Sequence, residues 1–133
     1  MKSVIKVKTE AREEMVDVTA EIQREVKKGG LQDGLCVAYV PHTTAGITIN
    51  EHADPAVARD LSETLARLVP HSAAYRHTEG NADAHVKASW IGSSVTLLVE
   101  NGKLVLGTWQ GVFFCEFDGP RSRSLYVQLI KSD

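Results

Sequence analysis

Residues 94–130, SVTLLVENGKLVLGTWQGVFFCEFDGPRSRSLYVQLI, decide the fold class, because they form a series of short apolar segments separated by turn residues. The segments are rich in β-branched and aromatic residues, which favour strands. Asn101-Gly102 is typical of a type I′ hairpin turn, and Gly119-Pro120 marks a second turn. The last third of the chain therefore predicts mostly antiparallel strands, at residues 94–100, 103–106, 111–117 and 124–130.

Three further strands are expected upstream of this region. Residues 3–9 alternate apolar residues with lysines, the period of two of a half-buried strand. Residues 34–40 and 43–50 are rich in β-branched and small apolar side chains, and Pro41 interrupts what would otherwise be one long strand. His42 is therefore expected just after a break between two strands.

Three helices are expected between these strands. The first ends at two lysines followed by two glycines and can be capped by Asp17 or Thr19. The second begins at Asp54-Pro55, where a carboxylate caps the helix and proline takes the first helical position. The third begins at Asn81. The apolar positions are Met15, Val18, Ile22 and Val26 in the first helix, Val57, Leu61, Leu65 and Leu68 in the second, and Ala82, Val86 and Trp90 in the third.

Together these elements predict an α+β fold, with residues 1–133 forming a single compact domain with a mostly antiparallel sheet and about three helices. The apolar segment 111–117 has no visible edge protection, so it is expected to need covering, and a neighbouring subunit is one way to cover it. Cys36 and Cys115 lie in apolar segments and are expected to be buried and reduced.

Composition excludes several classes of protein. The 15 basic and 17 acidic side chains give a net charge of −2, so no overall field attracts nucleic acid or an anionic membrane, and neither is an expected partner. No segment approaches the roughly twenty apolar residues that span a bilayer, and the first residues lack the apolar block of a secretory signal. The expected compartment is the cytoplasm.

Three histidines are candidates for a metal site. His42 follows the strand break, His77 lies in a polar loop, and His85 lies near the start of the third helix. Imidazole is a usual ligand of Zn²⁺, and a catalytic metal keeps one position open for water or substrate. His77 and His85 are eight residues apart rather than four, so only folding can bring them together with His42. The alternative is that each imidazole is a hydrogen-bonded residue of the core or rim.

Polar residues also follow the strand of residues 43–50. Glu51 is placed to orient an imidazole or to transfer a proton, whereas Asp54 before proline suits a helix cap better. Trp109 and Gln110 lie between two glycines, a composition that suits close approach by a ligand or, alternatively, a tight bend with a core tryptophan.

Two arginines follow the Gly119-Pro120 turn. Arg121 and Arg123 are able to present guanidinium groups to a phosphate. The alternative is that they are solvated or paired, as arginines at hairpin ends usually are.

Three stretches resemble the signature sequences of the YjbQ family, also called UPF0047. They are HTTAGITINEHADP at 42–55, YRHTEGNADAHVKAS at 75–89 and GTWQGVFFCEFDGPRSR at 107–123, and the resemblance extends from the first strand to the last. It implies a compact α+β subunit that assembles as a homotrimer with sites near subunit boundaries. The positions that match the family pattern are His42, Asn50, Glu51, Asp54, His77, Glu79, Gly80, His85, Trp109, Gln110, Glu116 and Arg121 or Arg123.

The resemblance also implies an activity, since the family is described as secondary thiamine-phosphate synthases. Such an enzyme joins a pyrimidine methyl diphosphate to a thiazole phosphate and releases pyrophosphate. In this hypothesis Arg121 or Arg123 and a divalent metal, Mg²⁺ or Zn²⁺, neutralise the small phosphorylated substrate, and Trp109 stacks on a ring. The expected catalytic residues are His42, Glu51, His77 and His85, and Asn50 and Gln110 are expected to contact substrate.

Two other hypotheses use the same residues. In one, His42, His77 and His85 hold Zn²⁺ and Glu51 deprotonates its bound water, which gives a metal-dependent hydrolase. In the other, the chain is a non-enzymatic trimer whose histidines hold a ligand or a structural ion.

Overall fold

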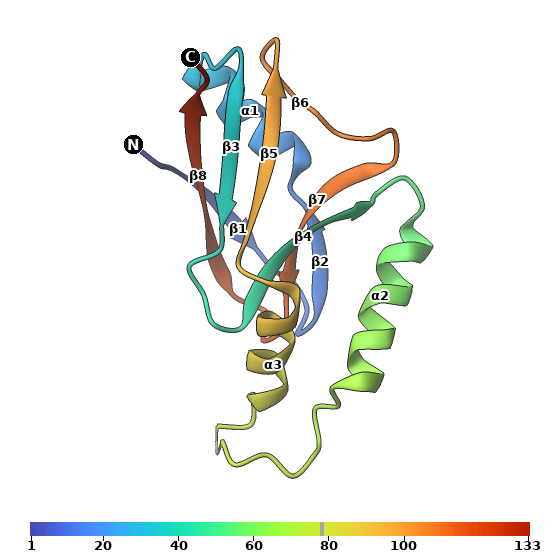
Figure 1. Ribbon diagram of the computed structural model, residues 1–133. Helices are drawn as coiled ribbons and strands as arrows, with labels where there is room; N and C mark the ends of the chain where they lie inside the picture. The colour runs from blue at the N-terminus through green and yellow to red at the C-terminus, as the bar shows by residue number, and fades with distance from the viewer. Residues whose placement is uncertain (78) are drawn as a thin grey trace.

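The chain folds into two antiparallel sheets and three helices over the residues that the computed structural model describes, 1–77 and 79–133. The helices are α1 (Thr19–Gly29), α2 (Pro55–Leu68) and α3 (Ala82–Ile91). Figure 1 shows α1 behind the large sheet, with α2 and α3 beside the small one. The expected α+β fold class is confirmed.

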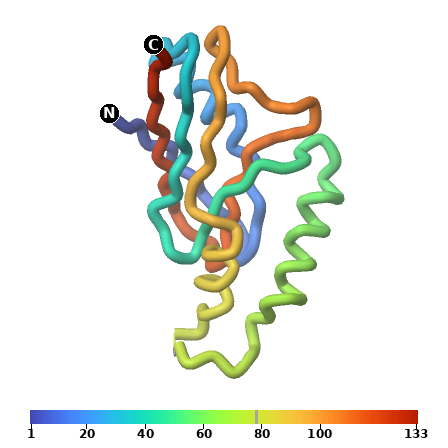
Figure 2. The backbone as a smooth tube through the Cα atoms, viewed as in Figure 1, coloured from blue at the N-terminus to red at the C-terminus, as the bar shows by residue number. Residues whose placement is uncertain are grey.

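The large sheet joins the first and last strands of the chain. β8 (Ser122–Lys131) pairs with β1 (Ser3–Lys8) on one side and with β3 (Gly34–Tyr39) on the other. β3 also pairs with β5 (Ser94–Glu100), and the short β6 (Lys103–Leu104) completes the order β1-β8-β3-β5-β6. The two termini consequently lie near the same end of the molecule (Figure 2).

The small sheet has β7 (Gln110–Glu116) at its centre, between β2 (Glu14–Asp17) and β4 (Ala45–Glu51). Both edges of β7 are therefore paired within the chain. The expectation that residues 111–117 form an exposed edge in need of covering was wrong, because β2, which the sequence pattern did not reveal, pairs with one side of this strand.

The main core lies between the two sheets and α1. Val112 and Phe114 of β7 point into it, where they join Ile22 and Val26 of α1. The intervening residues of β7, including Cys115, point to the outer face of the small sheet and form a second apolar cluster with α3. Burial on both faces explains why the sequence of β7 is apolar without interruption.

Several local expectations are confirmed. The Asp54 carboxylate accepts a hydrogen bond from the Ala56 N–H at 2.9 Å and caps α2, as its position before proline indicated. Asn101 and Gly102 both have positive φ, the requirement of a type I′ turn. Cys36 and Cys115 are buried and free, and burial raises the pKa of the Cys115 thiol to about 12.

The apolar stripes of the helices are where the sequence was misleading. Met15 belongs to strand β2 rather than to the first helix. In α3 the buried residues are Asp83, Ala84, Lys87 and Ala88, whereas Trp90 is 60% exposed. In α2 no residue is buried. None of the helices in the described part of the chain is long and apolar enough to cross a bilayer.

Candidate functional site

The structure separates the candidate site residues into two groups at opposite ends of β4. His42 precedes this strand, whereas Asn50 and Glu51 are its last two residues. A seven-residue strand is about 20 Å long at roughly 3.3 Å per residue. Within one chain, Glu51 is therefore too far from His42 to act on the same reacting atom.

An open hollow of about 750 Å³ lies at the first end of β4, and it brings together residues from three distant segments. His42, His85, Arg121 and Arg123 all line it. The other lining residues come from the end of β3 and the segment after it, from the two flanks of α3, and from the turn before β8: Tyr39, Val40, Pro41, Thr43, Thr44, Glu79, Asn81, Ser93 and Asp118.

His42 has a defined hydrogen-bonding role in this hollow. β3 ends at Tyr39, which leaves the Ser124 N–H of β8 without a strand partner, and the Nε2 atom of His42 accepts that hydrogen bond at 2.9 Å. Burial and the positive charge of Arg123 hold the pKa of His42 below its ordinary value. The ring is thus neutral at pH 7 and carries its proton on Nδ1, which makes it a hydrogen-bond donor with one fixed tautomer.

Arg123 is buried beneath the hollow in an ion pair with Glu116. Its guanidinium donates to both Glu116 carboxylate oxygens and to the Thr44 hydroxyl, the last at 2.9 Å. Burial alone would raise the pKa of Glu116, but the hydrogen bonds from Arg123, from the Asp118 N–H and from Thr9 lower it overall. Most of the hydrogen bonds of the Arg123 guanidinium are therefore used to hold β7, β8 and Thr44 together.

Arg121 is the more accessible of the two arginines. Its side chain is 52% exposed, and it donates to the Asp118 carbonyl at 2.8 Å and to the Asp118 carboxylate at 3.0 Å. Asp118 also accepts a hydrogen bond from the Asn81 amide at 2.9 Å. These contacts hold the Arg121 head at the rim of the hollow while leaving half of its surface open.

His77 and His85 lie together, with ring centroids 5.2 Å apart in an edge-to-face arrangement. Glu79 lies 3.8 Å from His77. Within residues 1–77 and 79–133, no group of three or more His, Cys, Asp or Glu side chains is arranged to hold a metal ion. A metal could bind His42 only through one of its two ring nitrogens. Nε2 already accepts the hydrogen bond from the Ser124 N–H, and Nδ1 would first have to lose its proton. As placed in one chain, these three imidazoles do not fit a tetrahedral Zn²⁺ site.

The second group lies where β4 ends and β7 begins, and most of its side chains close turns. Glu51 accepts the Ala53 N–H at 2.9 Å, and Gln110 accepts the Gly107 N–H at 2.8 Å. Asn50 accepts the Glu51 N–H. Trp109, by contrast, is 62% exposed, so it is a surface residue rather than the core tryptophan of a tight bend.

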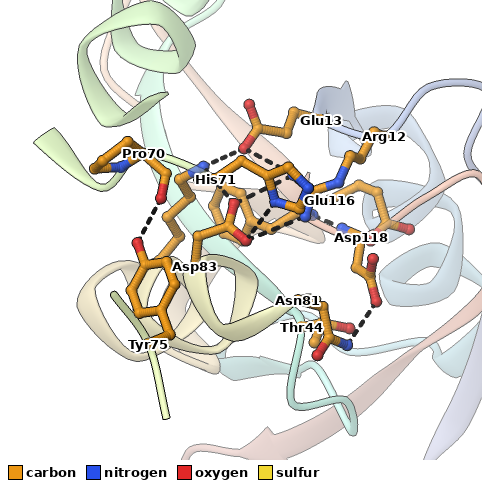
Figure 3. Close-up of polar contacts among 12 residues, drawn as sticks. Arg12, Glu13, Thr44, Pro70, His71, Tyr75, Asn81, Asp83, Glu116 and Asp118 are labelled. Atoms are coloured by element: carbon orange, nitrogen blue, oxygen red, sulfur yellow. Dashed lines mark hydrogen bonds and ion pairs between the residues drawn. The ribbon is translucent and has the colours of Figure 1, made fainter. Parts of the chain in front are cut away.

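A buried ion network was not anticipated from the sequence. Asp83 is fully buried and accepts hydrogen bonds from Arg12, at 3.1 and 3.2 Å, and from Lys87 at 3.1 Å; the His71 ring lies 3.0 Å away (Figure 3). Lys87, 1% exposed, also pairs with Glu13. The only local signal is the four-residue spacing of Asp83 and Lys87, because Arg12 and Glu13 come from a segment about 70 residues earlier and His71 from the loop before α3.

A family model described as "UPF0047 protein YjbQ-like" matches residues 3–132. The chain belongs to the UPF0047, YjbQ-like family. It is 52% identical over 124 residues to a UPF0047 protein of Methanocaldococcus jannaschii, covering 93% of this chain and 90% of that one. It is 47% identical to the YugU protein of Bacillus subtilis, covering 98% of this chain and 99% of that one.

Solved structures of relatives share the fold over nearly the whole chain. A YjbQ/UPF0047 family protein of Clostridium acetobutylicum superposes with a TM-score of 0.95 at 48% identity, covering 96% of this chain and 99% of that one. A protein of Sulfolobus solfataricus, described as of unknown function, gives 0.95 at 34% identity, covering 99% and 97%. These likenesses establish the family and the fold of the chain.

Proposed function

We propose that this chain is an enzyme that binds a small phosphorylated substrate in the hollow lined by His42, His85 and Arg121, with activity of the thiamine-phosphate synthase type. The observation that carries the proposal is the convergence, in one open hollow of about 750 Å³, of a neutral imidazole donor and a half-exposed guanidinium. That volume is within the range of roughly 300–1,000 Å³ that accommodates small ligands.

The donors of the hollow suit a phosphate. Arg121 supplies a charged fork, and His42 supplies a neutral N–H that needs no proton transfer before it donates. Buried Arg123 supports the His42 side of the hollow, because it donates to the Thr44 hydroxyl and its positive charge lowers the pKa of His42. The substrate is therefore expected to place its phosphate oxygens between Arg121 and His42.

The proposed reaction needs little from the protein beyond alignment and charge. The thiazole nitrogen attacks the methylene carbon of the pyrimidine, the C–O bond to diphosphate breaks, and the bonding electrons leave with pyrophosphate. Arg121 and His42 stabilise the negative charge that grows on this leaving group, and stabilisation that is stronger in the transition state accelerates the step. No serine or cysteine nucleophile is required, in agreement with the inert, buried thiols.

The proposal includes assembly as a homotrimer. Asn50, Glu51, Trp109 and Gln110 lie at the far end of β4 and join the hollow only if a second copy contributes them. The outward face of the large sheet offers a surface for such contacts, since cross-strand register places exposed apolar residues there: Val4, Tyr39, Leu98 and Ile130.

The test is an assay for pyrophosphate with the two substrates supplied separately and together. We expect release only when both are present, and we expect Arg121→Gln to lower kcat/KM about 100-fold, as loss of one charge-stabilising donor does. Arg67→Gln, at an exposed position of α2, is the matched control.

Turnover with water that a chelator abolishes would instead support the hydrolase hypothesis. Native mass spectrometry with elemental analysis reports the subunit number and any bound ion, and ligand binding without turnover would favour the non-enzymatic hypothesis.

A further inference from the structure

A second cavity, of about 170 Å³, lies between α2 and the outer face of the small sheet, away from the hollow. The side chains of β2, β4 and β7 on this face form its floor, and α2 covers it. Its apolar lining consists of Met15, Leu61, Leu65, Ile91, Cys115 and Phe117.

The packing around this cavity differs from that of the rest of the molecule. Protein interiors leave few voids larger than a water molecule. α2 nevertheless has no buried residue: Leu65 is only partly buried against the second apolar cluster, and Leu61 lines the cavity. An apolar cavity of about 150 Å³ stays dry and accommodates benzene or xenon, so the space here is the size of one ring.

The polar residues around the cavity restrict the charge of an occupant. Thr48 lies on the face of β4 that lines the cavity. Its hydroxyl has no hydrogen-bond partner among residues 1–77 and 79–133, so it is free to bind a polar substituent. Glu13 is paired with Lys87, whereas Glu14 accepts only the Glu10 N–H and contacts no cation among the residues described. An anionic ligand would be repelled by Glu14, and a neutral or amine-bearing one would not.

We propose that the cavity beneath α2 is a binding site for a ring-sized apolar group that is uncharged or carries an amine. Within one chain the site is separate from the hollow, although Asn50 lines it, and the proposal does not depend on the reaction catalysed in the hollow. The apolar side chains supply contact area, the Thr48 hydroxyl orients a polar substituent, and Glu14 selects against acids.

The test uses the two methionines as built-in probes. Met1 is fully exposed and Met15 lines the cavity, so protein labelled with ¹³C at the methionine methyl groups gives one reporter and one internal control. We expect benzyl alcohol and benzylamine to shift the Met15 signal saturably, through the ring current, and to leave Met1 unchanged. Benzoate, of the same size with a negative charge, should bind at least 10-fold more weakly.

Two tryptophan variants of α2 sharpen the test. Leu61→Trp fills the cavity and should abolish the Met15 shift, whereas Leu68→Trp, at a position 61% exposed on the same helix, should leave it intact. If Leu61→Trp does not fold, Thr48→Val provides the second variant and should weaken benzyl alcohol binding several-fold. The proposal is overturned if no probe shifts Met15 saturably, if benzoate binds as well as benzylamine, or if folded Leu61→Trp protein binds as the original chain does.

Discussion

α2 and α3 lie on the same face of the small sheet, and they pack against it in opposite ways (Figure 1). α3 has no clear apolar stripe, yet it buries Ala84 and Ala88 against β7 and holds two charged residues, Asp83 and Lys87, in its interior face. α2 has a clean apolar stripe, yet none of its residues is buried.

The difference shows that amphipathic pattern and burial are separate properties. Small side chains let the α3 backbone approach the sheet closely, and the ion network with Arg12, Glu13 and His71 fixes it there. In α2, by contrast, Leu65 contacts the second apolar cluster only as a partly buried residue, and Leu61 lines the cavity. How closely a helix packs thus depends on the residues of the sheet and loops that contact it, and the sequence of the helix alone does not reveal them.

The largest effect is expected from removing the centre of the α3 network. Asp83→Ala leaves the buried Lys87 ammonium and Arg12 without their shared carboxylate, and breaking a buried pair in this way costs about 3–5 kcal/mol. Urea denaturation monitored by circular dichroism measures the free energy of unfolding. The control is Asp60→Ala on the exposed side of α2. A loss of less than about 1 kcal/mol would mean that the network does not attach α3.

Adding volume to each helix should separate the two packing modes. Ala84→Leu overpacks the contact of α3 with β7 and should cost about 1–3 kcal/mol, because Ala84 is fully buried in the second apolar cluster. Leu61→Phe also enlarges a side chain, but beside the cavity, and should change stability by less than about 0.5 kcal/mol, or raise it. Paired thermal and urea unfolding curves provide the comparison, and equal losses in the two variants would contradict it.

The sequence predicted most of the strands and all three helices, because period-two and helical patterns, the Asp54 cap and the Asn101-Gly102 turn are local signals. It missed β2, whose four residues are too few to show a period, so Met15 was attributed to a helix. The sequence also predicted that Trp90 is buried, which was wrong. The helical spacing of an apolar residue does not show whether another part of the protein covers it.

The candidate site was predicted only in part. His42, His85 and Arg121 do share a hollow, and their convergence depends on the β3–β8 and β4–β7 pairings rather than on any spacing in the chain. Glu51 and Trp109 were grouped with them from sequence motifs, but β4 separates the two sets by its length. The assignments of metal, substrate and trimer remain predictions.

A smaller effect is expected on the free energy of unfolding at low pH, and it also distinguishes α3 from α2. Burial raises the pKa of Asp83, but hydrogen bonds from Arg12, His71 and Lys87 outweigh it and hold this pKa well below the ordinary 3.8. The resulting stability is present above about pH 4 and is lost as the pH falls, because the unfolded chain takes up the proton first.

Between pH 7 and pH 3 the original chain should therefore lose about 1 kcal/mol more than Asp83→Asn does. Urea titrations of both proteins at the two pH values measure this double difference. Asp60→Asn on α2 should show no such difference, since Asp60 has no charged partner among the residues described. Parallel losses for all three proteins would exclude Asp83 as the acid-sensitive group.

The smallest effects are expected at the exposed ends of the two helices. Leu68→Ala on α2 and Trp90→Ala on α3 remove large apolar side chains that are 61% and 60% exposed, so each should change the unfolding free energy of a single chain by less than about 0.5 kcal/mol. Measuring both variants over a 100-fold range of protein concentration distinguishes the chain from an assembly. If a second copy covers one of these residues, the original chain will gain stability as the protein concentration rises, because burial between copies contributes only when copies associate. The variant at that residue will gain less, so its difference from the original chain will grow with concentration. The helix that responds would then be the one whose outer surface faces the subunit boundary.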